Sequence, residues 1–227
     1  MRLILPLLLT FVAQATLVAV DLPTVMAEMN TVAAQYKGMN AKIRSVTYTK
    51  LVDDTSVESG EIWVQRNSKG QIGLRIAFTE PARKQVRVEG TTVEIYIEGI
   101  NQIDEYDLKS KSEQLEEALL IGFGASGDYL QERYDIELVG EELLEGVATV
   151  ELLLTPKDKE ARAKGQTLEM WVSTATWQPI QQKLNEADGD YRLYYYGDAK
   201  INPGIKPADL KFKFPRGKRP KRVKPGA

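Results

Sequence analysis

The chain has neither cysteine nor histidine among its 227 residues. Without cysteine it has no thiol nucleophile, no disulfide framework and no thiolate zinc site. Without histidine it has no Ser-His-Asp triad and no imidazole-bearing metal centre, so a metal ion would have to be held by carboxylates alone. A formal net charge of −2 gives no indication of a nucleic-acid partner. We therefore expect neither an enzyme nor a bound cofactor or metal.

The first residues are typical of an export signal. Arg2 precedes an apolar stretch over residues 3–13, and small residues allow cleavage after Ala15 or Ala19. We expect residues 1–19 to be a cleaved signal peptide and the protein to reside in the periplasm. The alternative is a retained anchor, for which the stretch is short.

Residues 20–215 are expected to form one domain of mainly β structure with some α-helix. Apolar residues recur at helical spacing from Val25 to Tyr36, and a second helix is predicted over residues 110–123. Between and after these helices the period is two, which predicts about eleven strands. The twelve candidate segments for these strands cover residues 43–51, 60–66, 71–78, 85–88, 92–98, 102–107, 135–139, 147–155, 167–173, 180–186, 191–197 and 210–214. Many strands with two helices favour a single unclosed antiparallel β-barrel over a sandwich.

The two helices must bury their apolar stripes, and the concave face of the sheet is the large apolar surface available to them. We expect them to form a lid over a hydrophobic cavity. The lid residues would be Met29, Val32, Ala33, Tyr36, Leu115, Leu119 and Phe123. The cavity residues, chosen by alternation, would be Ile62, Val64, Leu74, Ile76, Phe78, Val93, Ile95, Ile97, Val150, Leu152, Leu154, Leu168, Met170 and Val172. The alternative is that these rows fill a solid core, since packed interiors are the rule.

One charged side chain shares this apolar face. In the segment GEIWVQR, alternation places Arg66 on the same side as Ile62 and Val64. A guanidinium is costly to desolvate, so it needs hydrogen-bond partners or an opening to water. A cavity with a movable cover could use Arg66 as a latch. The alternative is an arginine at the barrel mouth with its head in water.

Three segments carry a family resemblance: GEIWVQR, VRVEGTTVEIY at Val86–Tyr96 and DLKFKFPRG at Asp209–Gly217. They resemble, in turn, the Gly-x-Leu-Trp-x-x-Arg strand, the strand–turn–strand and the closing Phe-x-Phe-x-Pro-x-Gly strand of the periplasmic outer-membrane lipoprotein carrier proteins, the LolA family. The resemblance implies an unclosed barrel with a helical lid over a hydrophobic cavity. It also implies that Arg66 bonds lid carbonyls in the empty state. The chain departs from the family at Asn67, where proline is common, and at Glu94-Ile95, which replaces Leu-Trp.

The resemblance implies a periplasmic carrier that shields the acyl chains of lipoproteins, or of a related lipid, and delivers them to the outer membrane. Its expected partners are those acyl chains, an inner-membrane donor and an outer-membrane acceptor, with transient membrane-surface contact. The protein is expected to be a monomer. The alternative is a periplasmic sensor or interaction module of the same fold that detects lipoproteins or lipids without transporting them.

Three further features of the sequence are weaker signals. Residues 216–227 are basic and rich in proline and glycine, so we expect a flexible tail that attracts anionic headgroups or an acidic partner, or only solubilises the chain. The glycines at 122, 124 and 127 match G-x-G-x-x-G outside any βαβ unit, so we interpret them as a lid hinge rather than a dinucleotide site. Neighbouring carboxylates such as Glu141 and Glu142 are interpreted as solvated rather than as a glycosidase pair.

Overall fold

The structure is a computed structural model that describes residues 20–112, 115, 121 and 123–225. The predicted signal peptide lies outside the described residues, and so does most of the helix predicted over residues 110–123. Within the described ranges, no helix combines the length and apolar character needed to cross a membrane.

The described chain folds into one twelve-stranded sheet with short helices. The strands are β1 (Gly38–Thr49), β2 (Asp54–Arg66), β3 (Ile72–Glu80), β4 (Lys84–Glu89), β5 (Thr92–Ile97), β6 (Gln102–Asp107), β7 (Tyr134–Leu144), β8 (Val147–Pro156), β9 (Thr167–Ser173), β10 (Pro179–Asn185), β11 (Tyr191–Ile201) and β12 (Lys221–Val223). The α-helices are α1 (Leu22–Gln35), α3 (Gly127–Arg133) and α4 (Lys159–Ala163), and 3-10 turns occupy Lys50–Val52, Glu98–Ile100 and Lys109–Lys111.

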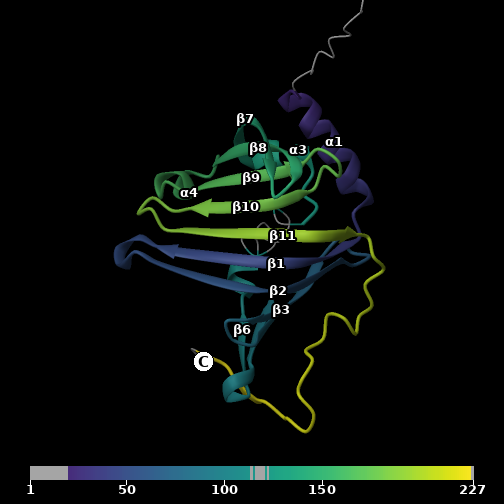
Figure 1. Cartoon of the computed structure of the whole chain (residues 1–227), viewed down its shortest axis with the longest axis vertical. Coiled ribbons are helices and arrows are strands. Elements are labelled where there is room, and N and C mark those ends of the chain that lie inside the picture. Colours follow the sequence, from purple (N-terminus) through teal and green to yellow (C-terminus); the bar gives the residue numbers. More distant parts are fainter. Residues whose placement is uncertain (1–19, 113–114, 116–120, 122, 226–227) are drawn as a thin grey trace, which may run out of the picture.

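The strand order is β12-β6-β5-β4-β3-β2-β1-β11-β10-β9-β8-β7 (Figure 1). Every described pair is antiparallel except β12 with β6, which is parallel. In the described sheet β7 and β12 are the edges and do not pair with each other, so the sheet stays open. The predicted fold class, mainly β with an unclosed antiparallel barrel, is confirmed.

Helix α1 forms as the sequence predicts. The Asp21 carboxylate caps it by accepting a hydrogen bond from the Thr24 backbone N–H at 2.9 Å, and Pro23 lies in the first turn, where its missing N–H costs nothing. The helix ends at Gln35, with Tyr36 as its C-cap, ahead of Gly38 and the start of β1. Its buried residues are Val25, Met26, Met29 and Ala33. This stripe is what docks α1 onto the sheet.

The register of the strands places all the predicted cavity residues on one face, here called the inner face. Leu74 of β3, for example, lies opposite Val64 of β2 and opposite Val88 of β4. Two apolar clusters cover this face. The first joins α1 and α3 to β8 and β9. The second joins Tyr36 and Phe123 to β1, β2, β3, β4 and β11.

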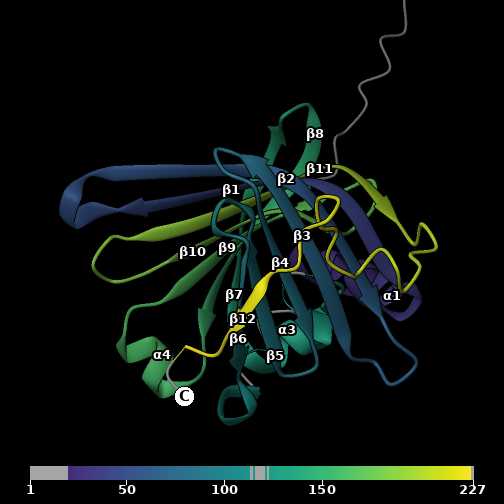
Figure 2. The ribbon, with the colours of Figure 1, turned by 90° about the horizontal axis from the view of Figure 1, so that it is seen from below.

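The C-terminal strap, residues 202–225, covers the opposite or outer face of β2–β6 (Figures 1 and 2). The Arg75 guanidinium, only 1% exposed, donates to the Asp209 carbonyl at 2.7 Å. Tyr96, fully buried, packs edge-on against Phe214 with ring centroids 5.0 Å apart. The strap is therefore part of the folded domain, which extends past residue 215.

Two expectations for this region are wrong. Residues 210–214 form no strand, because the side chain of Gln85 takes the place of a ladder partner: it donates to the Lys213 carbonyl at 2.6 Å and accepts from the Lys213 N–H at 3.1 Å. The tail expected to be flexible instead forms β12, which pairs with β6. Its basic residues find acidic partners on the sheet, which local sequence alone does not show.

Candidate functional site

A hollow of about 1050 Å³ opens on the inner face, where the two apolar clusters meet. Its described lining is Ile43, Ile62, Leu74, Ile76, Ile121, Phe123, Glu132, Arg133, Tyr134, Pro156, Lys157, Asp158, Glu160, Ala161, Gln166, Thr167, Leu168, Gln182, Leu184, Asn185, Glu186, Arg192, Tyr194 and Tyr196. The floor is aliphatic, from β1, β2 and β3. The rim is charged and comes from α3, α4 and the turn after β10.

Aromatic residues from β11 form one wall of the hollow. Tyr194 and Tyr196 point to the inner face two residues apart, and burial raises the pKa of both phenols, so they stay neutral. Tyr196 packs edge-on against Phe123 at 5.5 Å between centroids. Gln182 of β10 donates to the Ile121 carbonyl at 2.8 Å, which ties Ile121 to the sheet beside the hollow.

The predicted cavity residues divide into three groups. Ile62, Leu74, Ile76 and Leu168 line the hollow. Val64 and Phe78 are buried in the second cluster, Val93 packs against it, and Ile95 and Ile97 lie partly buried on the same face. Val150, Leu152, Leu154, Met170 and Val172 are buried in the first cluster with α1 and α3. Under α1 the solid-core alternative therefore describes the packing, and a hollow remains only beside it.

Sequence reasoning missed most of the lining, including four residues on the sheet. Ile43, Gln182, Tyr194 and Tyr196 all contact the hollow. The alternation that identified the other rows continues through β1 and β11, so Ile43 and the two tyrosines were open to the same argument. Gln182 gave no apolar signal.

The predicted lid residues lie on the helical side of these clusters. Met29 and Ala33 are buried on α1, with Val32 partly buried. Tyr36 and Phe123 are buried in the second cluster, and Leu115 packs against it. Leu119, and Gly122 of the predicted hinge, lie outside the described residues.

Arg66 connects the end of β2 to both covering segments. Its Nη2 donates to the Gly124 carbonyl at 3.0 Å, and its Nη1 donates to the Ala33 carbonyl of α1 at 3.4 Å. The guanidinium also lies over the Tyr36 ring, 5.5 Å from the centroid. Its Nε is buried with no partner among the described residues. Arg66 thus has the lid-carbonyl partners that a latch would use; the latch role itself stays a prediction.

Position 124, where the Arg66 guanidinium contacts the backbone carbonyl, requires a glycine. Its φ is +82°, in the left-handed region, and a Cβ there would lie 2.6 Å from the Tyr36 ring. Burial raises the pKa of the Tyr36 phenol, and the nearby Arg66 cation opposes the rise only in part. The contact is therefore tight and uncharged except for the guanidinium.

No protein-family model matches this sequence, and no curated protein matches it either. Solved structures do match. The crystal structure of MucB has a TM-score of 0.54 at 18% identity, over 85% of this chain and 63% of that chain. The chain shares its fold with the matched part of MucB. An uncharacterised conserved protein from Thermus thermophilus has a TM-score of 0.54 at 12% identity, over 89% of this chain and 98% of that one.

The chain spans only 60–63% of the MucB structures it matches. A LolA superfamily protein from Nitrosomonas europaea matches at 13% identity over 86% of this chain and 99% of that one, but its TM-score of 0.40 is too low to carry an argument. Identities at these levels establish the fold alone. The architecture expected from the motifs, an open barrel with helices on its inner face, is confirmed by the strand order and the two clusters.

The described residues contain no group of three or more metal-ligating side chains placed to hold a metal ion. The polar groups at the rim instead form a mixed set of both signs, including Glu132, Lys157 and Arg192. Such a rim suits a ligand that is apolar at one end and polar at the other.

Proposed function

We propose that the protein is a periplasmic carrier that holds the acyl chains of a lipidated protein, or of a related lipid, in the hollow and passes them to an acceptor. The observation that carries the proposal is the hollow of about 1050 Å³ above an aliphatic floor. Pockets for small ligands measure roughly 300–1,000 Å³, so this space is large for a small polar metabolite and suits long chains.

The energetics of acyl transfer fit such a space. Each methylene kept from water is worth about 0.8 kcal/mol, so one sixteen-carbon chain is worth on the order of 12 kcal/mol. Several chains on one molecule cannot leave a membrane at a useful rate unless a protein shields them. A floor of Ile62, Leu74 and Ile76 supplies the apolar contact, and the charged rim keeps the polar end of the ligand in water.

Release requires that the free energy of the loaded state be only modestly lower than that of the empty state. Arg66 supports this balance, because its bonds to Ala33 and Gly124 stabilise the arrangement in which the covering segments lie against β2. A ligand that moves the 123–125 segment must break these bonds. Part of its binding energy is then offset, and the ligand leaves more readily.

A second candidate function is a sensor or interaction module without transport. One observation favours it: MucB, which shares this fold, has been crystallised in complex with MucA. In this function the hollow would detect a lipidated ligand and the protein would report it to a partner instead of delivering it.

Transfer between vesicles separates the two functions. A fluorescent tri-acylated lipopeptide is loaded into donor vesicles, and its arrival in acceptor vesicles is followed with and without the purified protein. A carrier accelerates transfer in proportion to its concentration, whereas a sensor binds the lipopeptide and leaves the transfer rate unchanged. Absence of binding contradicts both.

The hollow is tested in the same assay by filling it. Ile76→Trp places an indole over the floor, and Ile100→Trp adds the same group at an exposed position, 64% accessible, outside the hollow. Binding is expected to fall at least about tenfold in the first variant and to persist in the second.

A further inference from the structure

The edge of the sheet at β6 is occupied by the chain's own C-terminus. β12 pairs with β6 in parallel, with Lys221 opposite Gln102, Arg222 opposite Ile103 and Val223 opposite Asp104. The Lys221 N–H donates to the Asn101 carbonyl at 3.0 Å, which starts the ladder. A short strand therefore covers backbone groups of β6 that would otherwise be unpaired.

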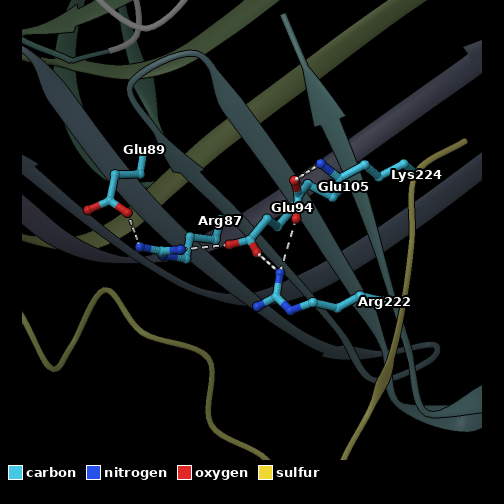
Figure 3. A network of polar contacts seen from close by, with 6 residues as sticks. All are labelled: Arg87, Glu89, Glu94, Glu105, Arg222 and Lys224. Atoms are coloured by element: carbon cyan, nitrogen blue, oxygen red, sulfur yellow. Dashed lines mark hydrogen bonds and ion pairs between the residues drawn. The ribbon is translucent and has the colours of Figure 1, made fainter. Parts of the chain in front are cut away.

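Two glutamates on the sheet form ion pairs with basic side chains in and beside this strand (Figure 3). The Arg222 Nη1 lies 2.5 Å from Glu94 Oε1 and 3.2 Å from Glu105 Oε2, and Lys224 Nζ lies 3.2 Å from Glu105 Oε1. The two cations are two residues apart and so project to the same outer face. The β6 edge thus recognises an extended segment with basic residues at alternate positions.

The hold on β12 is weak. The strand has three residues and pairs in parallel, and Arg222 and Lys224 are 55% and 69% exposed, so their ion pairs add little stability. Glu94, only 5% exposed, does not depend on β12 for its charge partner. Arg87 Nη1, on β4, lies 2.6 Å from its Oε2, so Glu94 has a charge partner other than Arg222 (Figure 3).

We propose that the β6 edge is a docking site for an extended basic segment of a partner protein, and that β12 occupies the site until that segment replaces it. Main-chain pairing with β6 gives the affinity, and Glu94 and Glu105 give the specificity for cations at alternate positions. The site lies on the outer face and at the sheet edge, so it is separate from the hollow.

The test uses the full chain and a labelled peptide of residues 218–225, Lys-Arg-Pro-Lys-Arg-Val-Lys-Pro. Arg222→Glu frees the edge by repelling β12 from Glu94 and Glu105, and Lys218→Glu makes the same charge change outside the strand. The peptide is expected to bind Arg222→Glu about tenfold more tightly than the wild type or Lys218→Glu, because β12 no longer competes. Adding Glu94→Gln and Glu105→Gln to Arg222→Glu should remove the gain.

Three results would overturn the proposal. Equal or absent binding to all three proteins means that no exchangeable site exists, and equal binding of a scrambled peptide means charge attraction without strand pairing. The third is independent of the variants: in the wild type, the amides of residues 221–223 should exchange with deuterium about a hundredfold faster than those of β5. Equal protection would make β12 a permanent strand.

Discussion

The Arg66 guanidinium donates to the Gly124 carbonyl at 3.0 Å, joining the end of β2 to the loop that leads into α3. The same side chain reaches the Ala33 carbonyl of α1. Two segments far apart in the sequence are thus held to the sheet by one residue beside the hollow. How readily these two segments move away from the hollow should therefore depend on Arg66.

Replacing Arg66 by leucine should weaken the cover and slow release. The carbonyls of Ala33 and Gly124 lose a charged donor, which costs about 1–3 kcal/mol in the free energy of unfolding. The substitution destabilises the empty arrangement more than the loaded one, so the ligand is held more tightly. Transfer of an acyl ligand to acceptor vesicles should therefore slow by about tenfold. Arg83→Leu, at a residue whose side chain is 71% exposed, is the control. Unchanged transfer in Arg66→Leu would remove the latch role.

Core and hollow should respond differently to truncation. Leu152 is fully buried beneath α1 and α3, so Leu152→Ala should lower the free energy of unfolding by about 2–5 kcal/mol. Ile76 is partly buried and borders empty space, so Ile76→Ala should cost less than about half as much. Urea denaturation measures both. Equal losses in the free energy of unfolding would mean that the floor of the hollow is packed as tightly as the core around Leu152.

The approach of α3 to α1 depends on Gly127. A Cβ there would lie 2.3 Å from the Met26 carbonyl oxygen and 2.7 Å from its Cα, both backbone atoms of α1. Gly127→Ala should therefore force the helices apart and cost about 1–3 kcal/mol, a fall of several degrees in the melting temperature. A Cβ on Gly99 meets nothing within 4 Å, so Gly99→Ala should melt like the wild type. Matching melting temperatures for the two variants would argue against a close helix contact.

Acid should release the C-terminal strand. Burial alone would raise the pKa of the Glu94 carboxyl, but hydrogen bonds from Arg222 and Arg87 hold that pKa below its usual value. Glu105 adjoins the same network through Arg222 and Lys224. A lowered pKa stabilises the ionised, folded arrangement above the unfolded pKa of about 4.3, and this contribution is lost as the pH falls through the lower folded value.

The release can be followed with a single label. Because the chain has no cysteine, Pro225→Cys gives a unique attachment point beside β12. The fluorescence anisotropy of the label should drop as the pH falls through the lowered pKa of Glu94, below the ordinary glutamate value of about 4.3. In Glu94→Gln that step should be absent or smaller. A step of the same size in both proteins would assign the release to other groups.

Alternation identified the inner face but could not say what covers it. Leu152 and Ile76 carry the same period-two signal, yet one packs under α1 and the other borders the hollow. Which of them a helix reaches depends on where α1 crosses the sheet, and this is set by contacts such as that of Gly127 with Met26. Such long-range geometry leaves no local pattern.

The prediction for the C-terminal region was wrong for a related reason. The alternation of Leu210, Phe212 and Phe214 is real, but these residues pack on the outer face, where Gln85 bonds the backbone in place of a ladder. The strand that does form has no apolar period and depends on carboxylates more than a hundred residues earlier. Arg66, by contrast, was identifiable because a charge within an apolar row requires an explanation.

Native mass spectrometry of the protein purified from the cells that make it shows directly whether the hollow holds acyl chains. Wild-type protein is expected to carry the added mass of an acylated ligand, Ile100→Trp protein to carry the same mass, and Ile76→Trp protein to lack it. Wild-type protein with only the mass of the bare chain, or equal ligand mass on both variants, would contradict a hollow that holds acyl chains.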